Sequence, residues 1–208
     1  MERKTIENIL NFLKEKEGME LPNSWFNSIK KLELIKELEN HPDGTQYRYE
    51  SDLFLPYSTI SKLPNDLYVG GSLRLYGCEQ ITKLPDKLYV RGNLSLSYSN
   101  ITKLPNDLYV GLDFDLDNSK ITELPEGLEV RGDLHLNHSS IKKLPNGLHV
   151  KGNLFLVGTS IDEIPNNLYV DKLLFLWSTP LADEYTSDEV YEMIKKRGGK
   201  IKGKIYTQ

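Results

Sequence analysis

Residues 84–103 read LPDKLYVRGNLSLSYSNITK, and closely similar stretches follow at 104–123, 124–143 and 144–163. The shared pattern, LPxxLxVxGxLxLxxSxIxx, returns every twenty residues. A repeat of this length indicates one small structural unit stacked on its neighbours, because a single unit buries too little apolar surface to fold alone. The sequence therefore predicts a solenoid.

Each position of the repeat has a physical role. Leu94 and Leu96 alternate with polar residues, which is the pattern of a short strand with both leucines inward. Leu88 and Val90 form a second extended segment on another wall, and Gly92 turns the corner between the walls. The Leu-Pro pair marks a further corner because proline fixes its own φ and lacks an N–H. We expect a β-rich, leucine-rich-repeat-like, right-handed parallel coil of about seven repeats of about 20 residues, with helical caps at both ends.

A short hydroxyl side chain follows each strand of the repeat. A stacked turn buries backbone groups that leave the strand ladder, and we expect these hydroxyls to satisfy them. A catalytic serine would not be copied into every coil, so the column is predicted to be structural. Its members are Ser99, Ser119, Ser139, Thr159 and Thr179.

The tract at 94–105, with the form LxLxxSxITxLP, resembles the short leucine-rich repeats of effector proteins from enteric bacterial pathogens. The full repeat also contains a VxG step, at 90–92 in this coil. With this step the sequence resembles more closely a group of bacteriophage repeat proteins, which also end in a helix and a Gly/Lys-rich tail. We expect a non-enzymatic protein-binding module, and the resemblance implies a sharper form of that function: a phage-encoded inhibitor of a bacterial defence system, of the anti-CRISPR or anti-restriction type, acting by steric block. The alternatives are a self-assembling structural component of a phage and an enzyme with an unrecognised site.

The two ends of the chain depart from the repeat. Apolar residues at helical spacing over 5–13 and 23–38 predict two helices that cover the first coil, although Trp25 and Phe26 could instead form a second binding surface. A further helix is expected over 186–197, followed by a basic tail. The predicted parts are a helical cap at 1–45, a solenoid at 46–182, and a helical cap with a basic tail at 183–208.

Composition narrows the class of protein. The 208 residues carry a formal charge of -4, which argues against direct nucleic-acid binding because no basic field is present. The single cysteine, Cys78, cannot form an internal disulfide and is interpreted as a loop residue rather than a nucleophile. No apolar run is long enough for a membrane span and no signal peptide is visible, so we expect a cytoplasmic protein of a bacterial host cell, without membrane contact.

The wall built from the strand at 94–96 and its equivalents in the other coils, the strand wall, is the predicted binding face. The repeat fixes the positions of its outward residues in a regular grid, but the residue type at each of these positions varies from coil to coil. Aspartates gather in the middle of this grid and aromatic residues toward its C-terminal end. We expect a protein partner with a basic and apolar surface. Two other interpretations stay open: the C-terminal helix or tail covers the aromatic end, or the wall forms a small-molecule groove. The predicted partner-binding residues are Asp113, Asp115, Asp117, Asp133, His135, Phe155, Val157, Phe175 and Trp177.

Other constellations carry less weight. A tyrosine column, interrupted by Glu129 and His149, is predicted to stack for structural reasons. His135 and His149 are predicted to lie on different walls, so shared metal coordination with His138 is not expected. The alternating aspartates at 113–117 lack the glycine and closing glutamate of a calcium loop. No metal, cofactor or catalytic residue is predicted. The tyrosines are Tyr68, Tyr89, Tyr109 and Tyr169.

Overall fold

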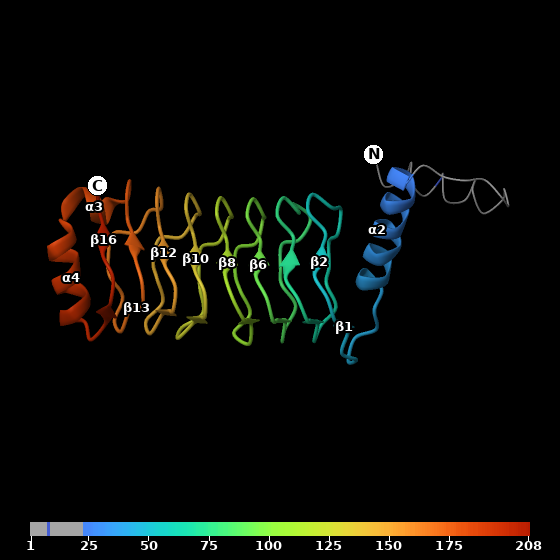
Figure 1. The fold of residues 1–208 in the computed structure, drawn as a ribbon, viewed down its shortest axis with the longest axis horizontal. Helices are drawn as coiled ribbons and strands as arrows, with labels where there is room; N and C mark the ends of the chain where they lie inside the picture. Colours follow the sequence, from blue (N-terminus) through green and yellow to red (C-terminus); the bar gives the residue numbers. More distant parts are fainter. Residues whose placement is uncertain (1–7, 9–22) are drawn as a thin grey trace.

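The structure, a computed structural model, is an elongated β-solenoid with helices at its two ends (Figure 1). It describes Asn8 and residues 23–208. The helix predicted over residues 5–13 lies outside the described part, as do the side chains of Trp25 and Phe26. The predicted fold class, a leucine-rich-repeat-like coil with parallel strands, is confirmed.

Parallel strands from successive coils form two walls. One wall is an eight-stranded sheet, which we call the strand wall, and the other is made of two four-stranded sheets, which we call the second wall. The strand wall contains, in spatial order, β16 (Ile205–Tyr206), β14 (Leu174–Phe175), β12 (Leu154–Phe155), β10 (Leu134–His135), β8 (Phe114–Asp115), β6 (Leu94–Ser95), β4 (Leu73–Arg74) and β2 (Leu53–Phe54). The second wall contains β1 (Arg48–Tyr49), β3 (Tyr68–Val69), β5 (Tyr89–Val90) and β7 (Tyr109–Val110), then β9 (Glu129–Val130), β11 (His149–Val150), β13 (Tyr169–Val170) and β15 (Lys200–Ile201).

The apolar positions of the repeat meet along the axis of the solenoid. Leu88, Val90, Leu94, Leu96 and Ile101 are all fully buried, and the same positions in the other coils join them in one continuous core. Burial of this periodic set is the main stabilising contribution, since each coil covers the apolar side chains of the next. The strand positions read from the sequence are therefore confirmed.

The corner glycine has a different cause from the predicted one. Gly92 does not lie in the left-handed region of backbone space. A Cβ atom there would lie 2.6 Å from Oγ of Ser72 and 2.9 Å from the carbonyl carbon of Gly71. Glycine is needed because the preceding coil approaches too closely for a side chain, and not because the turn requires a positive φ.

The hydroxyl column is buried throughout but only partly fulfils its predicted role. The hydroxyls of Thr159 and Thr179 each donate a 2.7 Å hydrogen bond to a backbone carbonyl three residues earlier. The three serine hydroxyls are buried with no hydrogen-bond partner among the described residues, which corrects the prediction for them. Cys78 continues the column and donates to the Leu55 carbonyl at 2.9 Å. The partnerless hydroxyls are those of Ser99, Ser119 and Ser139.

This difference predicts opposite outcomes within one column. Ser119→Ala is expected to change the free energy of unfolding by less than about 0.5 kcal/mol, because the hydroxyl makes no hydrogen bond. Thr179→Val is expected to cost about 1–2 kcal/mol, because that hydroxyl also accepts from the Ala182 N–H at the start of the helix α3 (Pro180–Glu184). Urea unfolding of both variants checks this, and equal losses would contradict it.

The N-terminal helix α2 (Asn23–Glu39) covers the first coil. Ile35 and Leu38 are buried in the common core. Lys31 donates to the Pro56 carbonyl at 2.9 Å, and a Glu39 carboxylate oxygen accepts from the Ser61 N–H at 2.8 Å. The helix therefore satisfies backbone groups of the first coil as well as covering the core at this end of the solenoid.

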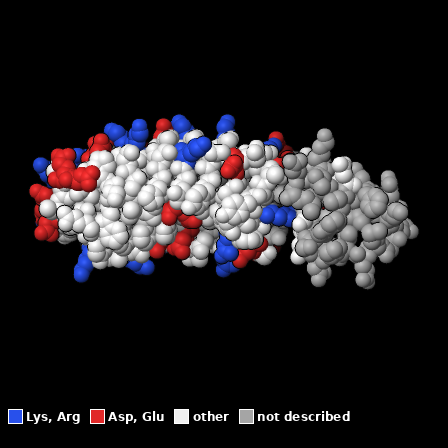
Figure 2. Space-filling model, turned by 90° about the horizontal axis from the view of Figure 1, so that it is seen from above, with Lys and Arg blue, Asp and Glu red and all other residues white. Residues whose placement is uncertain are grey.

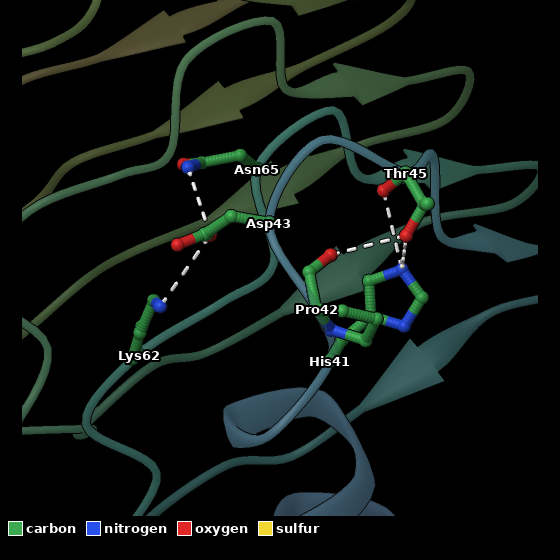
Figure 3. A network of polar contacts seen from close by, with 6 residues as sticks. All are labelled: His41, Pro42, Asp43, Thr45, Lys62 and Asn65. Atoms are coloured by element: carbon green, nitrogen blue, oxygen red, sulfur yellow. Dashed lines mark hydrogen bonds and ion pairs between the residues drawn. The ribbon is translucent and has the colours of Figure 1, made fainter.

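A polar network follows α2 and joins it to the first coils (Figure 3). Asp43 accepts a hydrogen bond from the Asn65 amide at 3.2 Å and lies 3.7 Å from the Lys62 ammonium. On the other side of the same turn, the Thr45 hydroxyl lies 2.9 Å from Nε2 of His41. These contacts connect the turn that follows α2 to the first coils.

The C-terminal end is closed by α4 (Ser187–Lys196), whose Val190 and Ile194 are buried. Thr186 and Glu189 form a capping box at its start. The hydrogen bond from the Thr186 backbone N–H to the Glu189 carboxylate lowers the pKa of Glu189. The tail then returns to the solenoid as β15 and β16, which pair in parallel with β13 and β14. The region predicted as a basic tail therefore supplies one more coil to both walls.

The second wall is interrupted in the middle. Its two sheets end at β7 and begin again at β9, while the strand wall continues without a break. In this coil the glycine of the repeat comes one residue early, at Gly111, and Leu112 takes the usual glycine position with 54% of its surface exposed. A hollow of about 260 Å³ lies between the two coils, beside Tyr109 and Arg131. The same coil departs from the repeat at a second position, because Phe114 replaces the usual inward leucine.

Candidate partner-binding face

The outward residues of the strand wall form two parallel columns. Because the strands pair in register, the residues of the first column lie side by side on successive strands: Asp115 pairs with His135, and His135 with Phe155. Most of the predicted residues are half-buried, and Trp177 is exposed at 40%. The inward residues between them are fully buried, so the grid of outward side chains is rigidly supported.

Stacked rings occupy the C-terminal half of the strand wall. The ring centroids of His135 and Phe155 are 4.4 Å apart, those of Phe155 and Phe175 4.7 Å, and those of Phe175 and Tyr206 5.0 Å, and the ring planes of each pair are nearly parallel. Trp177 packs its edge against Phe175. We call these five residues the aromatic strip. The tail does not cover Phe175 and Trp177 but adds Tyr206 to the stack, and the rings remain partly exposed.

Tyr206 is a member of the strip that sequence reasoning missed. It stands in register with Phe175, but α3 and α4 are inserted between the two strands and hide the twenty-residue period. The available signal was the pair Ile205-Tyr206, which repeats the inward-apolar and outward-aromatic order of Leu174-Phe175. Only pairing in space makes that signal readable.

Asp113 and Asp133 also have a structural role that the sequence did not predict, while their contact with a partner stays a prediction. Asp113 Oδ1 accepts from the backbone N–H of Asp133 at 2.9 Å, and Asp133 Oδ1 accepts from that of Asn153 at 2.7 Å. Asn93 and Asn153 continue the same ladder with the coils on either side. These side chains satisfy backbone donors at the corner where the ladder turns, so this role is structural.

Asp115 and Asp117 lie on the outer face. The Asp115 carboxylate accepts from the Ser95 hydroxyl at 2.9 Å and from the Asp117 N–H at 3.0 Å. Asp117 accepts from the backbone N–H and the side-chain amide of Asn137, and the side-chain Oδ1 of Asn137 accepts in turn from the Val157 N–H. Each carboxylate is oriented by neutral donors, and no ion pair to either is present among the described residues.

The two carboxylates border a hollow of about 650 Å³ on the strand wall, which we call the acidic hollow. The small side chains of Ser95 and Ser97 leave this depression between larger neighbours on both sides. Its lining also includes Arg74, Tyr76, Tyr98, Asp113 and His135.

The second wall is arranged differently, because its aromatic and charged groups have partners within the chain. Tyr68, Tyr89 and Tyr109 stack at 5.2 and 4.2 Å, with Arg48 over one end at 3.9 Å and Arg131 over the other at 5.2 Å. The predicted structural stacking is confirmed for these three tyrosines, and cation–π contacts close both ends of the stack. Tyr169 instead meets His149 edge-on.

Two carboxylates of the second wall have lowered pKa values. The hydrogen bond from Lys151 at 2.7 Å lowers the pKa of Glu129, and that from Lys202 at 2.9 Å lowers the pKa of Asp171. His149, 3.6 Å from Asp171, adds to the second effect when it is protonated. A carboxylate whose pKa is lower in the folded state than in the unfolded state stabilises the fold at pH values above its unfolded-state pKa. This stability is lost as the pH falls through the folded-state pKa.

We therefore expect the melting temperature to fall as pH drops below about 4, near the unfolded carboxylate pKa values. Asp171→Asn removes one of the responsible groups, so the variant is expected to lose less melting temperature between about pH 6 and pH 3 than the parent protein. Thermal scans across this range check the prediction. Asp162→Asn, at an exposed aspartate away from this cluster, is the control and should follow the parent.

The remaining predicted constellations are separated in space or absent. His135 lies in the strand wall and His149 in the second wall, as expected. Within the described residues, no group of three or more His, Cys, Asp or Glu side chains is placed to hold a metal ion. Cys78 is buried. No described helix combines the length and apolar character needed to cross a membrane.

Charges of both signs are interspersed over the described surface. In Figure 2 they gather mainly along the two long edges of the view, and uncharged residues fill much of the area between. This face shows no extended patch of one sign. Comparison with family models, curated proteins and solved structures finds no significant match to this chain.

Proposed function

We propose that this protein is a binding module that recognises a protein partner through the strand wall. The observation that carries the proposal is the aromatic strip beside the acidic hollow, on one rigid face. Partly exposed aromatic side chains clustered next to charge are the composition of interface hot spots. Asp115 and Asp117, held by neutral donors, add a charge that favours a basic partner.

The strip and hollow are also continuous with each other. His135 both ends the strip and lines the hollow, so one partner surface can contact both. The resemblance to phage repeat proteins extends the proposal to a specific partner class, a nuclease of a bacterial defence system, which the module would inhibit by steric block. That the chain lacks catalytic activity and acts in the cytoplasm stays a prediction.

A capture experiment tests the proposed face. The tagged protein is used to isolate partners from a bacterial lysate, and the affinity of each purified partner is then measured for the parent and for a triple variant, Asp115→Ala, Phe155→Ala, Trp177→Ala. We expect the triple variant to lose at least about 100-fold in affinity, because hot-spot aromatics and a charge are removed together. A control triple variant on other faces, Asp162→Ala, Tyr169→Ala, Tyr191→Ala, should bind like the parent. Unchanged binding by the strand-wall variant would overturn the proposal.

Self-assembly through the solenoid ends is the alternative. The helices α2 and α4 cover the two ends of the core, which supports recognition through the strand wall over end-to-end stacking. Light scattering over a range of concentrations separates the two functions. Concentration-dependent oligomers that survive high salt would favour assembly.

A further inference from the structure

The aromatic strip has an open end at His135. One face of the His135 ring stacks on Phe155, and on its other side the register neighbour is Asp115, which is not aromatic. The acidic hollow begins at this point, because His135 and Asp115 both line it. A flat group lying over the Asp115 position would continue the stack by one coil and would lie against the carboxylates.

The acceptors around this position favour a cationic donor. The hydrogen bonds that Asp115 and Asp117 accept come from a serine hydroxyl, backbone N–H groups and an amide, so neither carboxylate has an ion-pair partner among the described residues. Arg74 lines the same hollow, but its guanidinium lies over Phe54. A carboxylate has about four acceptor positions, so these contacts leave some unused. Carboxylates on the second wall, by contrast, are paired with lysines.

The second wall shows how the same protein closes an aromatic stack. Its tyrosine stack ends on the guanidinium of Arg48 at one side and of Arg131 at the other. The strand wall has the corresponding stack, but at the His135 end the column continues with Asp115, Ser95 and then Arg74. Arg74 lies over Phe54, at 5.7 Å from the ring centroid, on the side away from Asp115.

We propose that the acidic hollow takes the guanidinium of an arginine in an extended segment of the protein partner, stacked on His135 and hydrogen-bonded to Asp115 and Asp117. This inference rests on the proposed function and specifies its chemistry. A guanidinium is planar, permanently charged and able to donate two parallel hydrogen bonds to carboxylates while it stacks. A lysine ammonium matches the charge but has no flat face.

The strand wall also sets the spacing of the bound segment. Phe155 and Phe175 lie two and three coils beyond Asp115, which is about 10 and 14 Å at about 4.8 Å per coil. An extended chain advances about 3.3–3.6 Å per residue. Because side chains of an extended chain alternate between two faces, an apolar side chain four residues from the arginine faces the same wall and reaches Phe175 of the aromatic strip.

Peptide display on the full-length protein tests the proposal. Random peptides of about twelve residues, long enough to span the strand wall, are selected on the immobilised chain and counter-selected on the Phe155→Ala, Phe175→Ala double variant. We expect arginine to be enriched four positions from an aromatic or aliphatic residue. A selected peptide and its forms with lysine or citrulline in place of arginine are then titrated by fluorescence polarisation.

The titrations have defined outcomes. We expect lysine to weaken binding about tenfold and citrulline more, and Asp115→Asn, which keeps the side-chain shape, to weaken the arginine peptide about tenfold. Asp162→Asn should leave it unchanged, and circular dichroism confirms folding of each variant. Peptides that need the aromatic strip but show no arginine preference, or no response to Asp115→Asn, would overturn this inference and leave the proposed function standing. Peptides indifferent to the strip, or the lack of any specific binder, would count against both.

Discussion

Phe114→Ala is expected to lower the free energy of unfolding by about 3–5 kcal/mol, because it empties the largest fully buried side chain of the core. Phe114 lies in β8, at the inward position that leucine occupies in the other coils. The coils on both sides are pinned by the ladder of the strand wall, so they cannot close the space fully. The loss is expected to exceed the transfer free energy of the removed ring, and the excess comes from the cavity that remains.

Phe155→Ala is the matched control, since it removes the same side chain from the outer face of the same sheet. Its ring is partly exposed and stacked between two other rings, so we expect a loss of only about 1 kcal/mol. Urea unfolding gives both values, and hydrogen exchange at β8 and its neighbours shows where the loss is located. Similar losses for the two variants would mean that the core does not depend on the inward column.

Gly152→Ala is expected to cost about 2–3 kcal/mol, although alanine normally stabilises a chain by restricting its unfolded state. The added Cβ would overlap Oδ1 of Asp133 and lie 2.6 Å from the carbonyl carbon and oxygen of Gly132. Asp133 cannot move away without releasing the Asn153 N–H that it accepts at 2.7 Å. The substitution therefore strains the backbone and the polar ladder together.

Gly127→Asn provides the contrasting case. Gly127 has a φ of +67°, and a Cβ added there would meet no atom within 4 Å. Asn167 takes a similar backbone conformation at the matching position, with a φ of 55°. Asparagine tolerates this region, so we expect a change of less than about 1 kcal/mol. Thermal and urea unfolding of the two variants measure the difference. If Gly152→Ala unfolds like the parent protein, close approach of the coils is not what requires the glycine.

Much of the fold could be predicted because the information is local and repeated. Leu94 and Leu96 alternate as a half-buried strand requires, and their equivalents return every twenty residues, so the inward set follows without knowledge of any distant contact. The candidate site was predicted in outline for the same reason. Asp115, His135, Phe155 and Phe175 share one position of the template and therefore one column of the strand wall.

Sequence reasoning did not predict the contacts that a side chain makes, or fails to make, with a neighbouring coil. Asp113 and Asp133 look like surface charges in sequence, but in space they accept backbone N–H groups of the following coil. The hydroxyl of Ser119 looks like a turn-stabilising group but is buried without a partner among the described residues. Such roles depend on the exact distance between coils, which the repeat pattern does not encode.

The amino-acid sequence alone determined the period, the inward residues and the columns of the strand wall, since periodicity is a property of the chain itself. Tertiary structure decided which charges are structural, that Tyr206 extends the aromatic strip after two inserted helices, and that the second wall is interrupted at Gly111. Each of these depends on what the adjacent coil presents across a gap of about 4.8 Å. That contact exists only once the coils have stacked.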